Sequence, residues 1–328
     1  MQALVTGANG FIGSNLVKYL LEKGISVTAL VRKTSDLRFL DGLDVRLTYG
    51  DITDSDSLQS PMKGMDWVFH VAGLASDWGP YQRFYDINVT GTKNVVTAAA
   101  AAHVKRIIHI STVAFHGFGY QNIHEDYAVA KNLIPYAETK YLAEKWLFEF
   151  TKDKKIEATA IRPGNVFGPN DHTFMEKYLT AIQRKQAPQI NHGKSKTCPV
   201  YIENLVDAIY LAARQPEAVG EAFFITDGLD ITWNEFNNKL AEALNTKMPS
   251  ISIPYGLGYA VAALIEGSYK LLGIKSEPFL TKYRINNGGK DYHFSIEKAG
   301  RLLGYKPRVD IDEAVKRTVK WFLDTHQS

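Results

Sequence analysis

The sequence contains almost no cysteine and little net charge. Cys198 is the only cysteine among 328 residues, which excludes an intramolecular disulfide and a zinc site built on cysteine. A reducing compartment, the cytoplasm, is therefore expected, with no signal peptide before the first strand. The formal net charge is +3 and no basic block is present, so nucleic acid is not an expected partner. We expect no metal ion either.

Long hydrophobic runs are also missing. The longest apolar stretch, Gly256 to Ile265, has about half of the roughly 20 residues that a membrane-spanning helix needs. No transmembrane segment is therefore predicted. We expect a helix from Leu257 to Leu272 that is buried against the protein. The alternatives are a helix that borders an apolar substrate site and one that contacts a membrane peripherally.

The first fourteen residues carry the strongest local pattern. A short apolar run, Gln2 to Thr6, leads into Gly7-Ala8-Asn9-Gly10-Phe11-Ile12-Gly13, where an amphipathic segment begins. A strand, a glycine-rich turn and a helix in this order are typical of a dinucleotide-binding site. Gly7 permits the sharp turn, Gly10 the approach of backbone N–H groups to a pyrophosphate, and Gly13 close packing of the helix. An ordinary strand-to-helix turn is the alternative.

Apolar strands alternate with helices along the first half of the chain. This rhythm predicts an α/β fold with a doubly wound parallel sheet and a ligand site at the carboxyl ends of its strands. The dinucleotide-binding domain is expected at residues 1–162, with 199–226 returning to it. Residues 163–328 are expected to form mainly a smaller, mixed substrate lobe. The expected strands are Gln2–Thr6, Ile25–Val31, Asp44–Tyr49, Trp67–Val71, Arg106–Ile110, Glu157–Ile161 and Ala222–Thr226. The expected helices include Phe11–Lys23, Tyr81–Ala102, Pro135–Thr151, Thr173–Arg184, Trp233–Leu244 and Ile311–Leu323.

A tyrosine and a lysine four residues apart stand at the start of one expected helix. This spacing places Tyr136 and Lys140 on one face, about 5–6 Å apart at Cβ. A nearby ammonium favours tyrosinate, so the pair can lower the phenol pKa and let Tyr136 exchange a proton with a substrate hydroxyl. Ser111 and Thr112 follow a strand and can hydrogen-bond the same substrate oxygen. A surface helix and a turn cap are the alternatives.

With these motifs in hand, the sequence resembles an extended short-chain dehydrogenase/reductase of the NAD-dependent epimerase/dehydratase family over nearly its whole length. The motifs that carry the resemblance are Thr6–Gly13, Gly50–Asp54, Val68–Ala72, Asn88–Thr92, Ser111-Thr112 with Gly117, Tyr136-x-x-x-Lys140, Arg162–Pro169 and Glu203–Ala208. The fold that it implies is a Rossmann domain with a smaller C-terminal substrate lobe.

The resemblance also implies roles for the matched positions. Tyr136 would be the acid/base, Lys140 would hold the nicotinamide ribose, and Thr112 would be the hydroxyl partner. Thr112 lies five residues before Gly117 as the family's hydroxyl does, although the family usually has Ser there; Ser111 remains the alternative. Besides Tyr136 and Lys140, the cofactor site would be formed by Gly7, Asn9, Gly10, Phe11, Ile12, Gly13, Arg32, Asp51, Ile52, Val71, Ala72, Pro163 and Val166.

The end of the second strand bears on the choice of cofactor. An acidic residue there accepts the ribose hydroxyls of NAD, whereas a cation accommodates the 2′-phosphate of NADP. Arg32 and Lys33 occupy this position, and no acid follows before Asp36. NADP is therefore favoured over NAD, with a solvated surface arginine as the alternative.

The lobe indicates the class of substrate. Members that act on nucleotide sugars usually have a diphosphate-binding Arg where this chain has Thr197. The segments Ala222–Gly228 and Thr232–Phe236 are similar to the branch with 3β-hydroxysteroid dehydrogenases, decarboxylating sterol dehydrogenases and lipid β-ketone reductases, with dihydroflavonol-type reductases nearby. We therefore expect an apolar small-molecule substrate, in a site bordered by Trp78, Tyr81, Phe115, Phe118, Phe174 and Tyr178.

Three questions stay open at this stage. A nucleotide-sugar epimerase or dehydratase would use the same cofactor, and a phosphate-binding arginine elsewhere in the lobe would favour it. A cofactor-sensing protein without turnover is a second alternative, although such relatives generally lose the Tyr/Lys pair. A homodimer is one assembly that the sequence allows.

Overall fold

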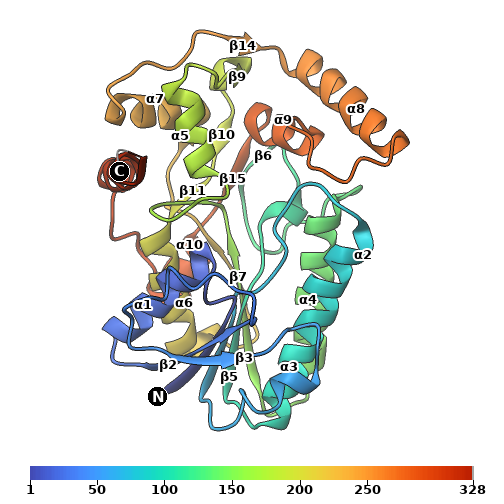
Figure 1. Ribbon diagram of the computed structural model, residues 1–328, viewed down its shortest axis with the longest axis vertical. Helices are drawn as coiled ribbons and strands as arrows, with labels where there is room; N and C mark the ends of the chain where they lie inside the picture. The colour runs from blue at the N-terminus through green and yellow to red at the C-terminus, as the bar shows by residue number, and fades with distance from the viewer. Residues whose placement is uncertain (327–328) are drawn as a thin grey trace.

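The computed structural model describes residues 1–326 and contains a seven-stranded parallel sheet in the order β12-β7-β5-β4-β1-β2-β3 (Figure 1). Each strand of this sheet runs parallel to its neighbours. The strands are β1 (Gln2–Thr6), β2 (Ser26–Val31), β3 (Arg46–Tyr49), β4 (Trp67–His70), β5 (Arg106–Ile110), β7 (Glu157–Pro163) and β12 (Ala222–Ile225). The predicted doubly wound α/β fold is confirmed.

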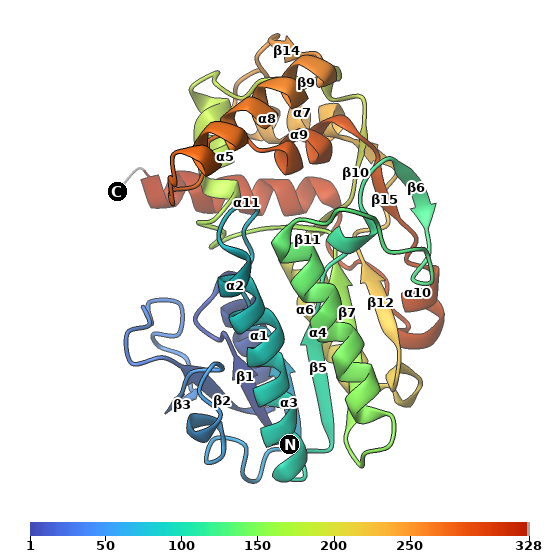
Figure 2. The same cartoon turned by 90° about the vertical axis from the view of Figure 1, so that its right-hand side faces the viewer.

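Helices cover both faces of this sheet. In Figure 2, α3 and α4 lie in front of the strands, while α1 and α6 lie behind them and pack on each other. The α-helices are α1 (Phe11–Glu22), α2 (Tyr81–Phe84), α3 (Gly91–Ala101), α4 (Pro135–Thr151), α5 (Met175–Gln183), α6 (Ile202–Arg214), α7 (Trp233–Ala243), α8 (Tyr255–Leu271), α9 (Lys282–Gly289), α10 (Glu297–Leu303) and α11 (Ile311–His326). Because both faces are covered, central strands such as β4 and β5 are buried throughout.

The strand order reverses between β1 and β4, which places a crevice at the carboxyl ends of these two strands. From β1 the chain moves outward through β2 to β3, and from β4 it moves the other way through β5 to β7. Every loop that follows a strand of this sheet therefore leaves from the same edge. This edge is where the predicted cofactor and catalytic residues converge.

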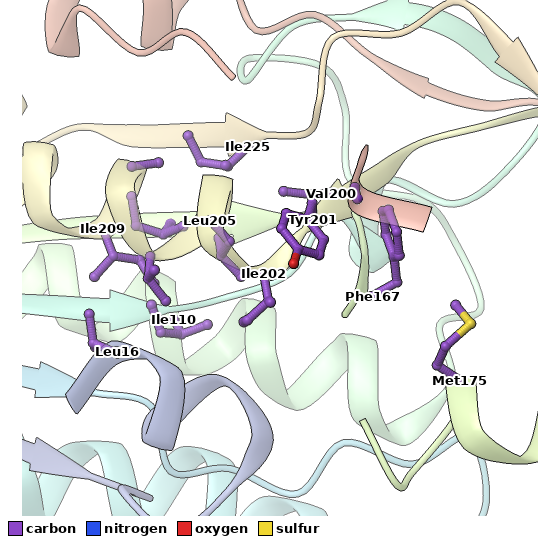
Figure 3. Close-up of a cluster of buried hydrophobic side chains, with 14 of the residues drawn as sticks. Leu16, Ile110, Phe167, Met175, Val200, Tyr201, Ile202, Leu205, Ile209 and Ile225 are labelled. Carbon is purple, nitrogen blue, oxygen red and sulfur yellow. The ribbon is translucent and has the colours of Figure 1, made fainter. Parts of the chain in front are cut away.

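One hydrophobic cluster extends from the sheet into the upper lobe (Figure 3). Leu16 of α1 and Leu205 and Ile209 of α6 pack beside the sheet. Farther along the same cluster, Phe167 and Met175 carry the core toward the lobe. Side-chain packing in this cluster is therefore continuous from the sheet to the lobe.

The lobe is held together by short strand pairs and helices. Its strands are β6 (Tyr120–Ile123) with β15 (Tyr292–Phe294), β8 (Asn165–Phe167) with β11 (Pro199–Tyr201), β9 (Gln189–Ile190) with β14 (Ser252–Ile253), and β10 (Lys196–Thr197) with β13 (Ile231–Thr232). The β6–β15 pair joins segments about 170 residues apart, which no local pattern predicts. In the second half of the chain, α6 covers the sheet and β12 extends it, whereas α5, α7, α8 and α9 lie in the lobe.

The helix expected over residues 81–102 is interrupted. A π-helical segment, Tyr85–Thr90, separates α2 from α3. Asn88 lies in this segment and is buried, with its amide bonded to the backbone of Leu74 and to Thr139. The π-helical turn occurs where Asn88 makes these tertiary hydrogen bonds, and such long-range bonds cannot be predicted from helical periodicity.

Helix α8 contradicts the expectation of burial. Leu264 is 75% exposed, Leu271 87% and Leu272 70%, although the helix occurs where the apolar stretch predicts one. Its buried residues are Gly258, Ala262 and Glu266, so small and polar side chains face the protein. Among the helices of residues 1–326, none combines the length and the apolar character required to span a membrane.

Candidate active site

The glycine turn brings β1, α1 and the end of β4 into close contact. Gly7 has a φ of 65°, and a Cβ atom there would lie 2.8 Å from Ala72 Cα. A Cβ atom on Gly13 would lie 2.0 Å from the Gly7 carbonyl oxygen, so only glycine lets the helix pack this closely. The turn geometry agrees with the sharp turn and the close packing expected at Gly7 and Gly13.

The N-terminus of α1 is suited to an anion. Gly10 is the N-cap and has no side chain to bond the first N–H groups of the helix, and the first turn carries no acidic residue. The backbone N–H groups of Phe11 and Ile12 lie in that first turn, and the helix dipole adds partial positive charge. Asn9 lies just before it and donates from its amide to the Asp36 carbonyl. These residues fit a dinucleotide pyrophosphate.

The residues predicted for the adenosine end follow β2 and β3. Arg32 is exposed immediately after β2, with its backbone N–H bonded to the Ser35 hydroxyl. Asp51 follows β3, and its carboxylate accepts hydrogen bonds from the N–H and the hydroxyl of Thr53. Ile52 lies against Gly91 of α3, where a Cβ atom would approach it to 2.7 Å. The cation and the carboxylate thus border the same end of the sheet.

The remaining predicted cofactor residues lie in or directly after β4, β7 and β8. Val71 and Ala72 follow β4, and the Ala72 N–H donates to the Thr6 hydroxyl of β1. Pro163 is the last residue of β7, and its carbonyl accepts from the Val113 N–H. Val166 lies in β8 and pairs with β11, outside the main sheet. Three of these four predicted residues, Val71, Ala72 and Pro163, lie at the carboxyl edge or directly beyond it, and Val166 is one short strand farther.

Tyr136 and Thr112 meet at this edge. Thr112 is buried just after β5, and Tyr136 is the second residue of α4 and is partly exposed. The Thr112 hydroxyl forms a hydrogen bond with the Tyr136 phenol, which favours the ionised form of the phenol. The neighbouring Ser111 hydroxyl is buried and lacks a hydrogen-bond partner among the described residues. The geometry therefore pairs Thr112, rather than Ser111, with Tyr136.

Lys140 lies one turn farther along α4 and is almost completely buried. Its ammonium donates to the Ile110 carbonyl, and its Nζ lies 3.4 Å from Nε2 of His109. Burial lowers the pKa of Lys140 to about 7, opposed by the charge of Glu144 one turn on. The pKa of His109 is also lowered by burial and by Lys140, so His109 is a neutral neighbour. Lys140 is thereby fixed at the end of β5, close to the Tyr136–Thr112 pair.

The expected effect of Lys140 on Tyr136 is wrong for this arrangement. Burial raises the pKa of the Tyr136 phenol above its usual value, and the hydrogen bond from Thr112 is what opposes the rise. The ammonium is directed at Ile110 and His109 instead. Spacing along a helix predicts that two side chains share a face, but not which partner each one selects.

A buried polar network supports the site. His70 of β4 bonds Thr6 through Nδ1 at 2.9 Å and Thr92 through Nε2 at 3.0 Å. The Thr92 hydroxyl donates to the Asn88 carbonyl at 2.6 Å, and the Asn88 amide reaches Thr139, next to Lys140. The glycine turn and the catalytic helix are thus linked through hydrogen bonds. The Asn88 side chain also satisfies the backbone N–H and carbonyl of Leu74.

A buried ion pair lies behind the catalytic helix. Glu144 accepts from the Arg162 guanidinium through both carboxylate oxygens, and Arg162 also donates to the Glu125 carbonyl. Burial and the Arg162 charge lower the pKa of the neighbouring His116 to about 4. The contacts of His109 and Glu144 could not be predicted from the sequence, because nothing in the local pattern distinguishes these two from ordinary strand and surface-helix residues.

The aromatic residues expected around an apolar site do not all lie there. Phe115 is buried against Tyr141, and Tyr178 donates to Asn237 inside the lobe. These two are core residues, because packing within the protein accounts for their contacts. Phe174 is exposed and stacks on Tyr178. The remaining three are closer to α8 and α9 or to the surface: Trp78 contacts Tyr269, Phe118 contacts Tyr283, and Tyr81 is exposed.

The position where the resemblance predicts a diphosphate-binding arginine in nucleotide-sugar enzymes is buried and uncharged in this chain. Thr197 is buried, and its hydroxyl accepts from the Asn165 amide at 3.2 Å. Arg284, an arginine of the lobe on α9, is paired with the carboxylates of Asp77 and Glu277. Its charge is therefore already compensated.

Comparison with known proteins identifies the family. The family model "NAD dependent epimerase/dehydratase family" matches residues 3–225. The chain is 33% identical to sterol-4-alpha-carboxylate 3-dehydrogenase, decarboxylating, of Mus musculus over 97% of this chain and 90% of that protein. It is 30% identical to 2-alkyl-3-oxoalkanoate reductase of Shewanella oneidensis over 96% of this chain and 84% of that protein.

A solved structure confirms the fold. UDP-glucose 4-epimerase of Thermotoga maritima, crystallised with UDP-glucose, superposes with a TM-score of 0.81 over 99% of each chain, at 22% identity. At this identity the likeness concerns the fold alone. With the family model, the relatives and the site geometry together, the chain belongs to the NAD-dependent epimerase/dehydratase family and is an NAD(P)-dependent short-chain dehydrogenase/reductase of the extended type.

Proposed function

We propose that this enzyme transfers a hydride reversibly between NADP and a hydroxyl or ketone of a largely apolar substrate. The observation that carries the proposal is the Thr112–Tyr136 hydrogen bond, with Lys140 one turn away, at the carboxyl edge of the sheet. The relatives add the substrate class, since they are named for a sterol carboxylate and for 2-alkyl-3-oxoalkanoates.

The proposed mechanism divides the work among three side chains. A bound nicotinamide supplies or accepts the hydride. Tyr136 holds the proton that the substrate oxygen gains on reduction and loses on oxidation, and Thr112 orients that oxygen through its hydroxyl. Lys140 is held by Ile110 and His109, which leaves one of its three N–H donors for the cofactor ribose. Gly7, Gly10 and the first turn of α1 bind the pyrophosphate.

The preference for NADP depends on Arg32. Its guanidinium is exposed at the end of β2, where a 2′-phosphate would lie, and a charge-assisted hydrogen bond would form there. NADPH is therefore expected to bind about tenfold or more tightly than NADH, and Arg32→Asp should abolish or invert the preference. Fluorescence titration with both nucleotides measures it. Equal affinities in the wild type would remove the argument from Arg32.

The main alternative is a nucleotide-sugar epimerase or dehydratase. Buried Thr197, in place of a cation, and the paired Arg284 both weigh against a diphosphate substrate. The deciding assay offers UDP-sugars beside 3β-hydroxysteroids and 2-alkyl-3-oxo acids, with reduced cofactor followed by absorbance and sugar products by chromatography. Conversion of a UDP-sugar, with no change of cofactor absorbance on the steroids or oxo acids, would favour the epimerase.

The partners of the protein beyond its substrate are also proposals: a membrane surface or a second copy of the chain. The exposed apolar face of α8 can serve a peripheral contact with a membrane or the interface of a homodimer. The excess of basic side chains around α8 favours the membrane.

A further inference from the structure

The largest group of exposed apolar side chains belongs to α8 and the turn that follows it. Leu257, Val261, Leu264 and Leu271 recur at intervals of four, three and seven residues and therefore form one stripe along the helix. With Leu272 and Phe279, which are 70% and 75% exposed, they form what we call the α8 face. Both views show α8 on the outside of the lobe, with α9 beneath it (Figures 1 and 2).

The inner side of α8 fixes the helix in this orientation. A Cβ atom on Gly258 would lie 3.0 Å from Ile285 of α9, so the two helices are close together there. Glu266 accepts from the Lys282 backbone N–H at 2.7 Å and pairs with the Lys282 ammonium at 3.3 Å. Turning the α8 face inward would expose Gly258 and break the bonds of Glu266. The contacts of Gly258 and Glu266 therefore keep the apolar stripe facing outward.

The charges around the α8 face are mostly positive. Residues 255–290 contain five basic side chains (Lys270, Lys275, Lys282, Arg284 and Lys290) and two acidic ones (Glu266 and Glu277). Arg284 is also paired with Asp77, so the basic side chains that form no ion pair within the described residues are Lys270, Lys275 and Lys290. Both acidic side chains are paired, with Lys282 and Arg284 respectively. An apolar stripe with a basic border is complementary to anionic lipid headgroups above acyl chains. Two copies of the face would instead bring their basic borders together.

The inner side of α8 contacts the loop that follows β4. Trp78, in the loop after β4, contacts Tyr269 at 6.1 Å between ring centroids, and the Lys270 ammonium lies 5.8 Å from its ring. On α9, Tyr283 packs in the same small cluster as the catalytic Tyr136. The contacts of α8 and α9 thus extend to the cluster that contains Tyr136.

From these contacts we propose that the α8 face docks on an anionic lipid bilayer, from which the enzyme takes its apolar substrate. The source of the substrate rests on the function proposed above, whereas the docking depends only on this surface. Helix α8 has 17 residues, about 25 Å, and would lie in the plane of the interface, with Leu264 and Leu271 immersed below the headgroups.

The test compares two variants of the full-length protein on vesicles. Wild type is sedimented with phosphatidylcholine vesicles and with vesicles that also contain phosphatidylglycerol. The double variant Leu264→Asp/Leu271→Asp removes the stripe, and Val219→Asp, at an exposed apolar residue before β12, is the matched control. We expect wild type and control to bind, more tightly on the anionic vesicles, and the double variant to bind at least about tenfold more weakly.

A second measurement separates docking from catalysis. Turnover of a water-soluble ketone should be equal in wild type and double variant, while turnover of a vesicle-embedded ketone should fall only in the double variant. Wild type that stays in the supernatant with all vesicles overturns the proposal. So does a dimer, seen by light scattering, that the double variant converts to a monomer, because the face would then join two copies. Vesicle binding without turnover of any ketone supports the docking and removes the proposed function.

Discussion

Helices α4 and α8 are both 17 residues long, but α4 buries several polar side chains whereas α8 exposes several large apolar ones. Helix α4 buries Thr139, Lys140 and Glu144, and each of these polar side chains has a hydrogen-bond partner. Helix α8 leaves Leu264 and Leu271 in solvent. In the proposed mechanism the buried polar side chains of α4 position the catalytic residues, and in the proposed docking the exposed apolar side chains of α8 contact a lipid bilayer. In both, departure from the usual pattern marks the functional face.

The largest effect is expected at the exposed end of α4. Tyr136→Phe keeps the ring and removes only the transferable proton, so kcat should fall by about 10² to 10⁴ while the affinity for the cofactor stays near wild type. Stopped assays for turnover and fluorescence titration for NADPH measure the two quantities. Activity within a few-fold of wild type would falsify the role of Tyr136 as the acid/base.

The next effect concerns the buried charge behind Lys140. Glu144→Ala leaves the Arg162 guanidinium without its carboxylate, and we expect the free energy of unfolding to decrease by about 3 kcal/mol or more. The matched control is Glu149→Ala on the same helix, whose exposed pair with Lys145 should contribute no more than about 0.5 kcal/mol. Urea denaturation measures both. A similar loss of unfolding free energy in both variants would contradict the prediction, because the buried pair would then contribute no more than the exposed one.

A pH dependence follows from the buried lysine. The pKa of Lys140 is about 7 in the folded protein and near 10.5 in the unfolded chain, so unfolding takes up a proton between these values. The stability of the cofactor-free protein should therefore rise with pH from about 7 upward, by at most about 1.4 kcal/mol per pH unit from this group. Lys140→Met should flatten that rise. Parallel stability curves for the two proteins would contradict the shifted pKa.

The smallest effect is expected on α8. Leu264→Asp should change the free energy of unfolding by no more than about 0.5 kcal/mol, because the side chain is already in water. Two residues away, Ala262 is fully buried, and Ala262→Asp should destabilise the protein by several times that amount. Thermal melts of the two variants test which side of the helix faces the protein. A large loss at Leu264 would mean that the stripe is part of the core.

Much of the sheet could be predicted because its signals are local. The ends of β1 and β5 occur at the expected residues, and those of the other expected sheet strands differ by at most two residues. Alternation of apolar strands with helices leaves few topologies, since parallel crossovers have one hand. The glycine positions also agree with their expected geometry, because a positive φ at Gly7 and close packing at Gly13 are demands of the backbone itself.

The hydrogen-bond partners and the burial of the site residues could not be predicted from the sequence. The Tyr136/Lys140 spacing predicts a shared helix face, yet the partner of Lys140 is His109, 31 residues earlier in the chain. The burial of Lys140, which lowers its pKa, depends on strands that pack around α4 rather than on its neighbours in sequence.

The sequence by itself determined the family, the parallel sheet and the order of the catalytic motifs, because glycine turns and hydrophobic periodicity act over a few residues. Only the tertiary structure decided which hydroxyl meets Tyr136, which groups hold Lys140, and that the apolar side of α8 faces outward. Those outcomes depend on contacts between distant segments, such as α8 with α9 and Trp78 with Tyr269. The same apolar stretch is compatible with burial or exposure until the residues packed against its other side are known.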